Sequence, residues 1–273
     1  RITLTDDYYP TRVELRLLDE CLPRIAEDIG VSARVIEPGT GAGIKTKRLL
    51  RALDQPASYV AIDVTREALD HTARVLAAEH PQLDIHTIAG DFTQPFALPT
   101  PRRPIGRTVV FFPGSTIGNF EPHEAVAFLG ALQRSAGGNS RLLLGADGTR
   151  DPGTVERAYN DSEGITAEFN RNILAHLNRT RGTTFDLDAF QHRAIWSERH
   201  SRIEMRLIAT RDQHVVLDRH IIDIPAGEPI ITEYSYKHSI PAMRGILLAA
   251  GWQVREVFTG KEQPMRLWLC EPC

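Results

Sequence analysis

Residues 109–112 (VVFF) form an uninterrupted apolar run of β-prone residues. A strand that is apolar on both sides is buried on both faces, which is typical of parallel sheets covered by helices on each side. Pro113 and Gly114 end the run, and a small polar loop, residues 115–119, follows. Ligands of open α/β sheets bind at the carboxyl ends of the strands. The sequence therefore predicts that Asn119 lies at a ligand-binding edge, where its side chain can hold a small polar substrate.

The first 150 residues alternate short apolar runs with helical patterns. The predicted strands are residues 34–37, 59–63, 83–89, 109–112 and 141–145, and the predicted helices are residues 45–53, 65–79 and 124–135. Repeated βα units of this kind imply a parallel sheet with right-handed crossovers. We therefore expect an α/β fold with a Rossmann-like sheet.

The pattern changes after residue 150. One helix is expected over residues 154–177, followed by antiparallel strands with one polar face at residues 202–209, 214–218 and 221–224. The α/β pattern then returns, with a helix at 242–250 that Gly251 ends and a hairpin of strands 253–258 and 265–270 around a turn at 259–263. We expect an inserted α+β lobe (1–12 plus 151–239) within a cofactor-binding domain (13–150 plus 240–273).

Charge and cysteine content exclude several classes of partner. The formal net charge of the 273 residues is -3, which offers no attraction to nucleic acid or anionic membranes. No apolar run approaches the ~20 residues of a membrane span. Cys21, Cys270 and Cys273 make neither a disulfide framework nor a metal site with two ligand pairs, so reduced thiols are expected. We expect a cytoplasmic monomer that holds no metal and acts on a small molecule.

A glycine-rich segment, residues 39–43 (GTGAG), joins the first predicted strand to the first predicted helix. Glycines there allow positive φ angles and a close approach of a ligand to the backbone. The GxGxG spacing, with Glu37 two residues before Gly39, is typical of class I enzymes that use S-adenosylmethionine (SAM). It is not the GxGxxG pattern of dinucleotide sites. A turn that is rich in glycine for packing reasons alone is the other interpretation.

Acidic residues also end the next two predicted strands. Asp63 can accept hydrogen bonds from both hydroxyls of a ribose. Asp91 can accept a hydrogen bond from the amino group of an adenine, while the backbone N–H of Phe92 donates to a nitrogen of the adenine ring. Alternatively, Asp63 caps the following helix and Asp91 is a turn residue. Three such strand ends in succession favour an adenosine site. Lys45, close to the glycines, is then expected to pair with the carboxylate of the cofactor, unless it is simply solvated.

Several sequence blocks, in the same order along nearly the whole chain, resemble the family of histidine-specific SAM-dependent methyltransferases. The blocks are YYPTR (8–12), GTGAGIKT (39–46), GDF (90–92), FFPGSTIGNF (111–120), GADGTRDP (145–152), AYND (158–161), FNRNIL (169–174), RIEM (202–205) and TEYSYK (232–237). FFPGSTIGN and TExSxK are specific to this family, whereas the glycine loop is not. Family members usually carry a longer segment before the YYPTR block, which implies a shortened N-terminal segment here.

The resemblance implies a role for each site residue. The cofactor SAM is expected to contact Gly39, Lys45, Asp63, Asp91 and Phe92. Tyr9, Asn119 and Tyr159 are expected to bind the α-amino and α-carboxylate groups of the substrate, with Asn119 and Tyr159 directing the reacting amine. Glu233 and Ser235, two residues apart on an extended segment, are expected to clamp an imidazole ring, and Gly114 and Met205 to form pocket wall.

The implied activity is methylation of the α-amino group of L-histidine, repeated to the trimethylated betaine, within ergothioneine biosynthesis. One alternative is N-methylation of another amino acid such as tryptophan, although an indole has a single donor and no acceptor for Glu233 and Ser235 to use together. The other alternative is a SAM-binding or partner-binding module without catalysis. A nicotinamide dehydrogenase fits poorly because the glycine spacing is wrong.

Overall fold

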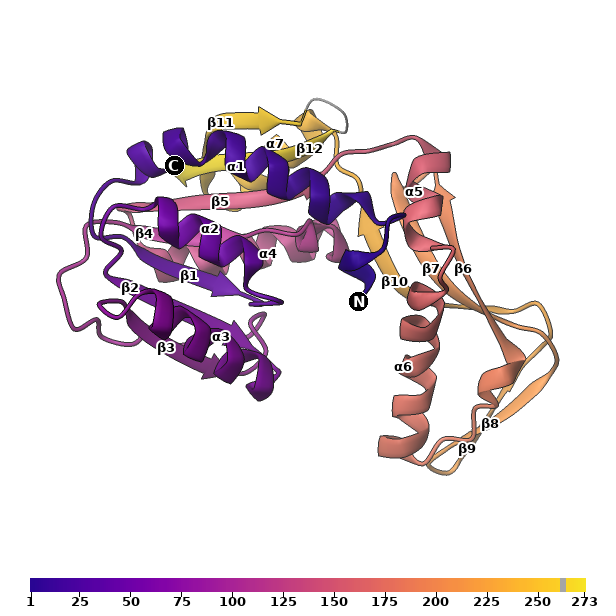
Figure 1. The fold of residues 1–273 in the computed structure, drawn as a ribbon. Coiled ribbons are helices and arrows are strands. Elements are labelled where there is room, and N and C mark those ends of the chain that lie inside the picture. The colour runs from indigo at the N-terminus through magenta and orange to yellow at the C-terminus, as the bar shows by residue number, and fades with distance from the viewer. Residues whose placement is uncertain (261–263) are drawn as a thin grey trace. The chain divides into compact units, whose positions relative to one another are not determined.

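The computed structural model describes residues 1–260 and 264–273, which form two compact units (Figure 1). The insert unit comprises Arg1–Thr11 and Thr149–Lys237, and the α/β unit comprises Arg12–Gly148 and His238–Cys273. The boundaries expected from the sequence, after residues 12, 150 and 239, lie within two residues of these positions. No helix in the described part of the chain is long and apolar enough to cross a membrane.

The α/β unit is built on a seven-stranded sheet with the order β11-β12-β5-β4-β1-β2-β3. Strands β1 to β5 are parallel, and β12 runs antiparallel to both β5 and β11. The expected C-terminal hairpin is therefore confirmed, while residues 261–263 of its turn lie outside the described residues. The strands are β1 (Arg34–Pro38), β2 (Ser58–Asp63), β3 (Asp84–Ala89), β4 (Thr108–Phe112), β5 (Ser140–Asp147), β11 (Trp252–Thr259) and β12 (Met265–Pro272).

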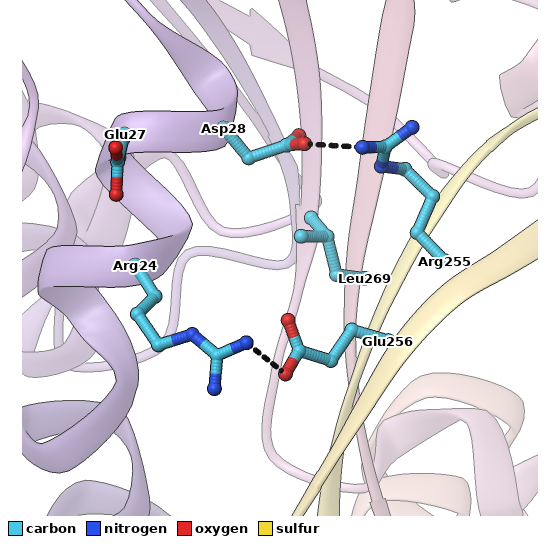
Figure 2. A pocket seen from close by; sticks show the side chains of 6 residues that line it. All are labelled: Arg24, Glu27, Asp28, Arg255, Glu256 and Leu269. Atoms are coloured by element: carbon cyan, nitrogen blue, oxygen red, sulfur yellow. Dashed lines mark ion pairs between the residues drawn. The ribbon is translucent and has the colours of Figure 1, made fainter.

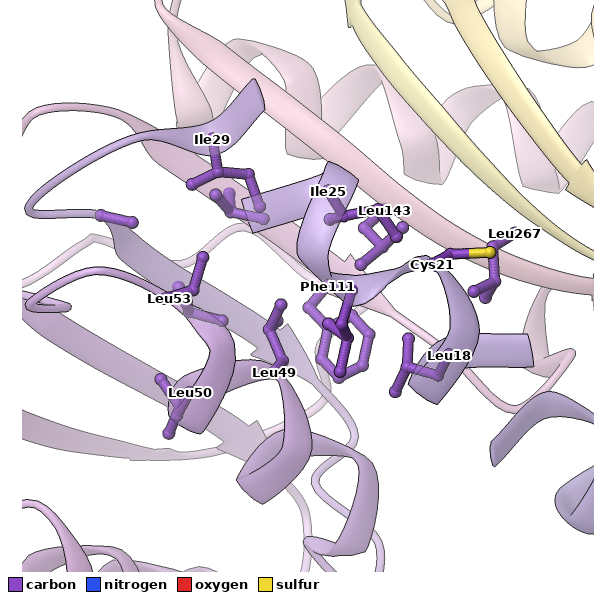
Figure 3. Close-up of a cluster of buried hydrophobic side chains, with 14 of the residues drawn as sticks. Leu18, Cys21, Ile25, Ile29, Leu49, Leu50, Leu53, Phe111, Leu143 and Leu267 are labelled. Atoms are coloured by element: carbon purple, nitrogen blue, oxygen red, sulfur yellow. The ribbon is translucent and has the colours of Figure 1, made fainter. Parts of the chain in front are cut away.

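Helices cover both faces of this sheet. Helices α1 (Tyr9–Ile29), α2 (Ile44–Ala52) and α3 (Arg66–Glu79) contribute to the apolar core on one face, part of which Figure 3 shows. Helices α4 (Pro122–Ala136) and α7 (Ile240–Ala249) contribute to the core on the other. Within β4, Val109 and Phe111 belong to the first core and Val110 and Phe112 to the second. The strand is therefore buried on both faces, as the VVFF run predicts.

The sequence patterns did not lead us to expect helix α1. Its buried residues follow helical spacing. Figure 3 labels Leu18, Cys21, Ile25 and Ile29 in the first core, and Leu22 belongs to the same core. Arginines and carboxylates between them, together with a proline inside the helix, weaken the pattern in the sequence. The first half of this helix carries the buried carboxylate of Glu14, which lies in the candidate functional site.

The strand order reverses between β1 and β4. The chain runs outward from β1 through β2 to β3 and then returns to place β4 on the other side of β1. A crevice opens at the carboxyl ends of the two strands that flank such a reversal, and it is the usual ligand position in open α/β sheets. Here those ends carry the glycine segment 39–43 and the Pro113–Gly114 turn.

The insert unit holds a three-stranded antiparallel sheet in the order β10-β7-β6, a separate hairpin and two helices. Its elements are α5 (Pro152–Tyr159), α6 (Ile165–Arg181), β6 (Phe190–Ser197), β7 (Arg202–Ala209), β8 (Gln213–Leu217), β9 (His220–Ile224) and β10 (Pro229–Tyr236). Strands β7, β8 and β9 match the expected antiparallel segments, whereas the sequence patterns did not identify β6.

The single helix expected over residues 154–177 is wrong, because the chain breaks it into α5 and α6. The Asp161 carboxylate accepts hydrogen bonds from the backbone N–H groups of Ile165 (2.8 Å) and Thr166 (2.7 Å). Gly164 precedes α6 with a φ of +71°, a conformation that glycine adopts readily. An acceptor side chain and a left-handed glycine thus start a new helix, and apolar periodicity cannot distinguish this from a continuous one.

Candidate functional site

The glycine segment after β1 lies against the end of β3. Gly39 has a φ of +76° and donates its N–H to the carbonyl of Ile62 on β2 (2.7 Å). A Cβ at Gly39 would lie 3.4 Å from Cε1 of Phe92, in tight contact with the ring. Phe92 in turn packs against Phe112 at a centroid distance of 6.1 Å. The structure therefore brings Gly39 and Phe92 together, as a shared cofactor site requires.

Asp63 links the glycine segment to the end of β2. Its Oδ2 accepts from the N–H of Thr40 (3.1 Å) and the Thr40 hydroxyl (3.4 Å), and its Oδ1 accepts from the N–H of Thr65 (2.9 Å). The side chain of Thr65 makes no capping bond to α3, so Asp63 takes part of that role. A carboxylate has about four acceptor positions, and capping thus leaves room for a ribose hydroxyl.

Asp91 is an exposed turn carboxylate at the end of β3. Its Oδ1 accepts from the hydroxyl (2.7 Å) and the N–H (2.9 Å) of Thr93. These two hydrogen bonds hold the pKa of Asp91 below its usual value. The group therefore stays ionised and can accept a hydrogen bond from an exocyclic amine, so the turn interpretation and the adenine interpretation are compatible.

Glu37 is a buried carboxylate at the end of β1 that ties three elements together. It accepts from the Tyr59 hydroxyl (2.5 Å) on β2 and from the Thr46 hydroxyl (2.7 and 2.9 Å) on α2. Burial raises the pKa of Glu37 to about 7, although the hydrogen bonds from Tyr59 and Thr46 oppose the shift. The hydrogen bonds of the Glu37 carboxylate thus hold the start of α2 against strands β1 and β2.

The Glu37→Gln variant should change the pH dependence of stability. Because the folded-state pKa of about 7 lies above the ordinary value of 4.5, the folded protein holds a proton that the unfolded chain loses between these pH values. The free energy of unfolding of the wild type therefore falls as pH rises through this interval, by up to about 3 kcal/mol. Glu37→Gln lacks this contribution. Urea unfolding at pH values from 4.5 to 7.5 measures the free energy of unfolding, and Glu67→Gln, at an exposed position, is the control. If the free energy of unfolding depends on pH in the same way in the wild type and in Glu37→Gln, the raised pKa of Glu37 is contradicted.

Lys45 is held by a buried carboxylate that the sequence analysis missed. The side chain of Glu14, on α1, is fully buried, and it pairs with the Lys45 ammonium. Both Glu14 oxygens also lie 2.9 Å from the backbone nitrogen of Gly114. The solvated-lysine interpretation is therefore wrong. Glu14 fixes Lys45 beside Gly114 at the point where the strand order reverses, and two of the predicted site residues meet there.

Asn119 ends a short 3-10 turn (Thr116–Asn119) that follows β4, and its side chain is exposed. In the loop before it, Ser115 adopts a φ of +60°, and its hydroxyl accepts from the N–H of Asp147 (3.0 Å) at the end of β5. The expected loop is thus confirmed at the carboxyl end of a central strand, with Asn119 available to a ligand.

In the insert unit, the expected imidazole clamp lies on one face of β10. Glu233 and Ser235 alternate along the strand, and Glu233 pairs in register with Met205 of β7. The Tyr159 hydroxyl, at the end of α5, donates to Ser235 Oγ at 3.0 Å. The structure therefore brings Tyr159, Met205, Glu233 and Ser235 into one cluster.

Tyr8 and Lys237 also belong to this cluster, and Tyr9 is the buried neighbour of Tyr8 in the chain. Tyr9, at the start of α1, is 6% exposed, and the preceding Tyr8 packs edge-to-face on Tyr159 at a centroid distance of 5.8 Å. Lys237 is fully buried and donates to both the Tyr159 and Ser235 hydroxyls, each at 3.1 Å. The sequence analysis gave Lys237 no role, although the alternation Glu233, Ser235, Lys237 in an extended segment was a signal for it.

A pocket of about 350 Å³ in the α/β unit is separate from all these residues. Figure 2 shows it between α1 and β11, lined by Arg24, Glu27, Asp28, Arg255, Glu256 and Leu269. Ion pairs cross it from Arg255 to Asp28 (3.1 Å) and from Arg24 to Glu256 (2.7 Å) (Figure 2). These ion pairs join α1 to β11, and no predicted site residue lines the pocket.

The fold resembles that of methyltransferases of known structure. Magnesium protoporphyrin IX methyltransferase from Synechocystis PCC 6803, a structure with bound SAH, superposes with a TM-score of 0.50 at 11% identity. The match covers 97% of this chain and 85% of that one. At such low identity the likeness concerns the fold alone, and it agrees with the expected Rossmann-like sheet.

Two curated relatives are closer in sequence. "Histidine N-alpha-methyltransferase" from Mycolicibacterium smegmatis is 39% identical over 87% of this chain and 74% of its own length. "Ergothioneine biosynthesis protein 1" from Neurospora crassa is 31% identical over 98% of this chain, which corresponds to 31% of that longer protein. The family model described as "Histidine-specific methyltransferase, SAM-dependent" matches residues 1–272. The chain belongs to the family of histidine-specific SAM-dependent methyltransferases.

Proposed function

We propose that this enzyme transfers the methyl group of SAM to the α-amino group of L-histidine and repeats the transfer to the trimethylated betaine. The observation that carries the proposal is the cluster of Glu233 and Ser235 on one strand face. An imidazole ring has two chemically distinct nitrogens, and a carboxylate beside a hydroxyl can bond both. The relative from M. smegmatis is named for methylation of the α-nitrogen of histidine, which supports the proposed position of transfer.

The carboxyl-end edge of the α/β sheet supplies residues suited to hold SAM. We assign the ribose to Asp63, the adenine to Asp91 and Phe92, and the amino-acid carboxylate of the cofactor to Lys45, with Gly39 allowing close approach. Bound SAM supplies an electrophilic methyl group on a sulfonium. The ionised Asp91 and the fixed ammonium of Lys45 fit the polar ends of such a molecule.

The amino group of the substrate must be neutral to act as a nucleophile. An α-amine has a pKa of about 8, so a usable fraction is neutral near physiological pH and a strong general base is not required. We assign binding of the α-amino and α-carboxylate groups to Tyr9, Asn119 and Tyr159. The Asn119 and Tyr159 oxygens accept the amine N–H groups and so direct its lone pair. Gly114 and Met205 form pocket wall, and positioning supplies most of the acceleration.

The named relatives and the free cysteines support a pathway and a cellular compartment for this enzyme. The match to a protein named for ergothioneine biosynthesis supports a place in that pathway. The three cysteines are free, which suits a cytoplasmic protein, and a monomer remains our prediction. Tryptophan is the alternative substrate, and a cofactor-binding module without catalysis is the alternative class.

Calorimetric titration of amino acids in the presence of S-adenosylhomocysteine tests the proposal. We expect saturable binding of histidine and none of tryptophan, because an indole offers Glu233 and Ser235 one donor and no acceptor. Binding of tryptophan in preference to histidine would contradict the proposed substrate. Binding of the cofactor product with no amino acid bound would favour the module without catalysis.

A further inference from the structure

Lys237 is a buried cation in direct contact with the proposed imidazole clamp. Its side chain is fully buried, and its ammonium lies 3.1 Å from Ser235 Oγ and 3.1 Å from the Tyr159 hydroxyl. It also lies 5.0 Å from the centroid of the Tyr159 ring. Removing an ammonium from water is costly unless it is hydrogen-bonded. The hydrogen bonds to the two hydroxyl oxygens offset part of this cost and determine how those hydroxyls can bond to other groups.

The direction of the hydrogen bonds in this cluster follows from the chemistry of an ammonium. An ammonium has three donors and no acceptor, so both hydroxyl oxygens accept from Lys237. The Tyr159 hydroxyl also donates to Ser235 Oγ, at 3.0 Å. Ser235 Oγ therefore receives two hydrogen bonds, which occupy both of its lone pairs. Toward a ligand, Ser235 can then offer only its own O–H.

We propose that Lys237 is a positioning residue that makes Ser235 an obligate hydrogen-bond donor, so that the clamp binds the neutral imidazole of histidine and rejects the imidazolium. The inference rests on the proposed function. A neutral imidazole has one acceptor nitrogen for the Ser235 O–H and one N–H for the Glu233 carboxylate. An imidazolium has two N–H groups, one of which would face the Ser235 proton and the Lys237 charge.

The titratable groups beside the clamp come from several elements of the insert unit. Glu233 lies on the same strand face, Tyr159 approaches from α5, and Tyr8 packs on the Tyr159 ring. His192 of β6 contacts the Tyr159 carbonyl at 2.9 Å, and burial lowers the pKa of this histidine. The α-amino group of free histidine, with a pKa of about 8, stays mostly protonated over this interval. In the ligand, the ring therefore accounts for most of the change in charge.

The test is the affinity for histidine, with S-adenosylhomocysteine present, at pH 5.5 and 7.5. With a ring pKa near 6.5, the neutral fraction falls about tenfold between these pH values, and we expect the wild-type affinity to fall by about the same factor. In Lys237→Met, Ser235 can turn and accept from an imidazolium. We expect this pH effect to shrink below about threefold, while affinity at pH 7.5 also falls.

Two further variants separate this role from a structural one. Lys237→Arg keeps N–H donors and should retain the wild-type pH effect. Tyr159→Phe removes the other donor to Ser235 Oγ and should weaken the pH effect even if Lys237→Met does not fold. Equal wild-type affinities at the two pH values, or a tenfold effect that survives in folded Lys237→Met or in Tyr159→Phe, would overturn the inference. Failure of the wild type to bind histidine at either pH, with S-adenosylhomocysteine bound, would overturn the proposed function and this inference with it.

Discussion

Glu233→Ala should lower kcat/KM for histidine by about 100-fold, equivalent to about 2.7 kcal/mol of lost stabilisation. The variant removes the carboxylate that is proposed to accept the imidazole N–H, and a hydrogen bond to a charged group contributes about 1.5–3 kcal/mol. Glu233 lies on β10, opposite Met205 of β7, the inner strand of the three-stranded sheet. Initial-rate kinetics with saturating SAM measure the effect.

The matched control for this experiment is Glu228→Ala. Glu228 is also a glutamate of the insert unit, immediately before β10, and its side chain is exposed. Its removal should leave kcat/KM within about twofold, because exposed substitutions away from special contacts change little. Affinity for S-adenosylhomocysteine should remain unchanged in both variants. A Glu233→Ala enzyme as efficient as the Glu228→Ala enzyme would refute the imidazole clamp.

Gly145→Ala should destabilise the α/β unit by about 2–3 kcal/mol and weaken cofactor binding. A Cβ on Gly145 would lie 1.8 Å from Glu14 Oε1 and 3.2 Å from the Cα of Pro113. Glu14 cannot easily move, because it is fully buried and holds Lys45 and the N–H of Gly114. Forcing it aside releases the lysine that is proposed to bind the cofactor. Chemical unfolding and titration with S-adenosylhomocysteine measure the two effects.

Gly245→Ala is the corresponding control. Gly245 lies inside α7 of the same unit, and no atom lies within 4 Å of the Cβ that alanine would add there. This variant should be as stable as the wild type or more stable by up to about 1 kcal/mol, because alanine favours a helix over glycine. If Gly145→Ala behaves like Gly245→Ala, the close packing of Glu14 against β5 does not matter for stability or cofactor binding.

The α/β unit was largely predictable because its signals are local. Residues 109–112 of β4 are all apolar, and Pro113 and Gly114 end the strand. Helix breaks and antiparallel pairing depend instead on contacts that no local pattern in the sequence marks. The division between α5 and α6 depends on the Asp161 carboxylate, and β6 depends on pairing with β7, so neither leaves a strong periodic signal.

The candidate site divides in the same way. The positions of Gly39, Asp63 and Asp91 at the edge of the sheet were predictable because parallel strands end at a common edge. Glu14 was not, because it lies 100 residues from its partner Gly114, and a buried glutamate on a helix resembles an exposed one in sequence. The contact of Tyr159 with Ser235 and Lys237 likewise joins distant segments that only the fold brings together.

The most direct test of the account is to identify the product formed from histidine and SAM that carries a ¹³C-labelled methyl group. NMR and mass spectrometry of the isolated amino acid locate the label and count the methyl groups. The account predicts label on the α-nitrogen only, with mono-, di- and trimethylated species appearing in that order. Label on a ring nitrogen, or unchanged histidine while another amino acid accepts the methyl group, would contradict it.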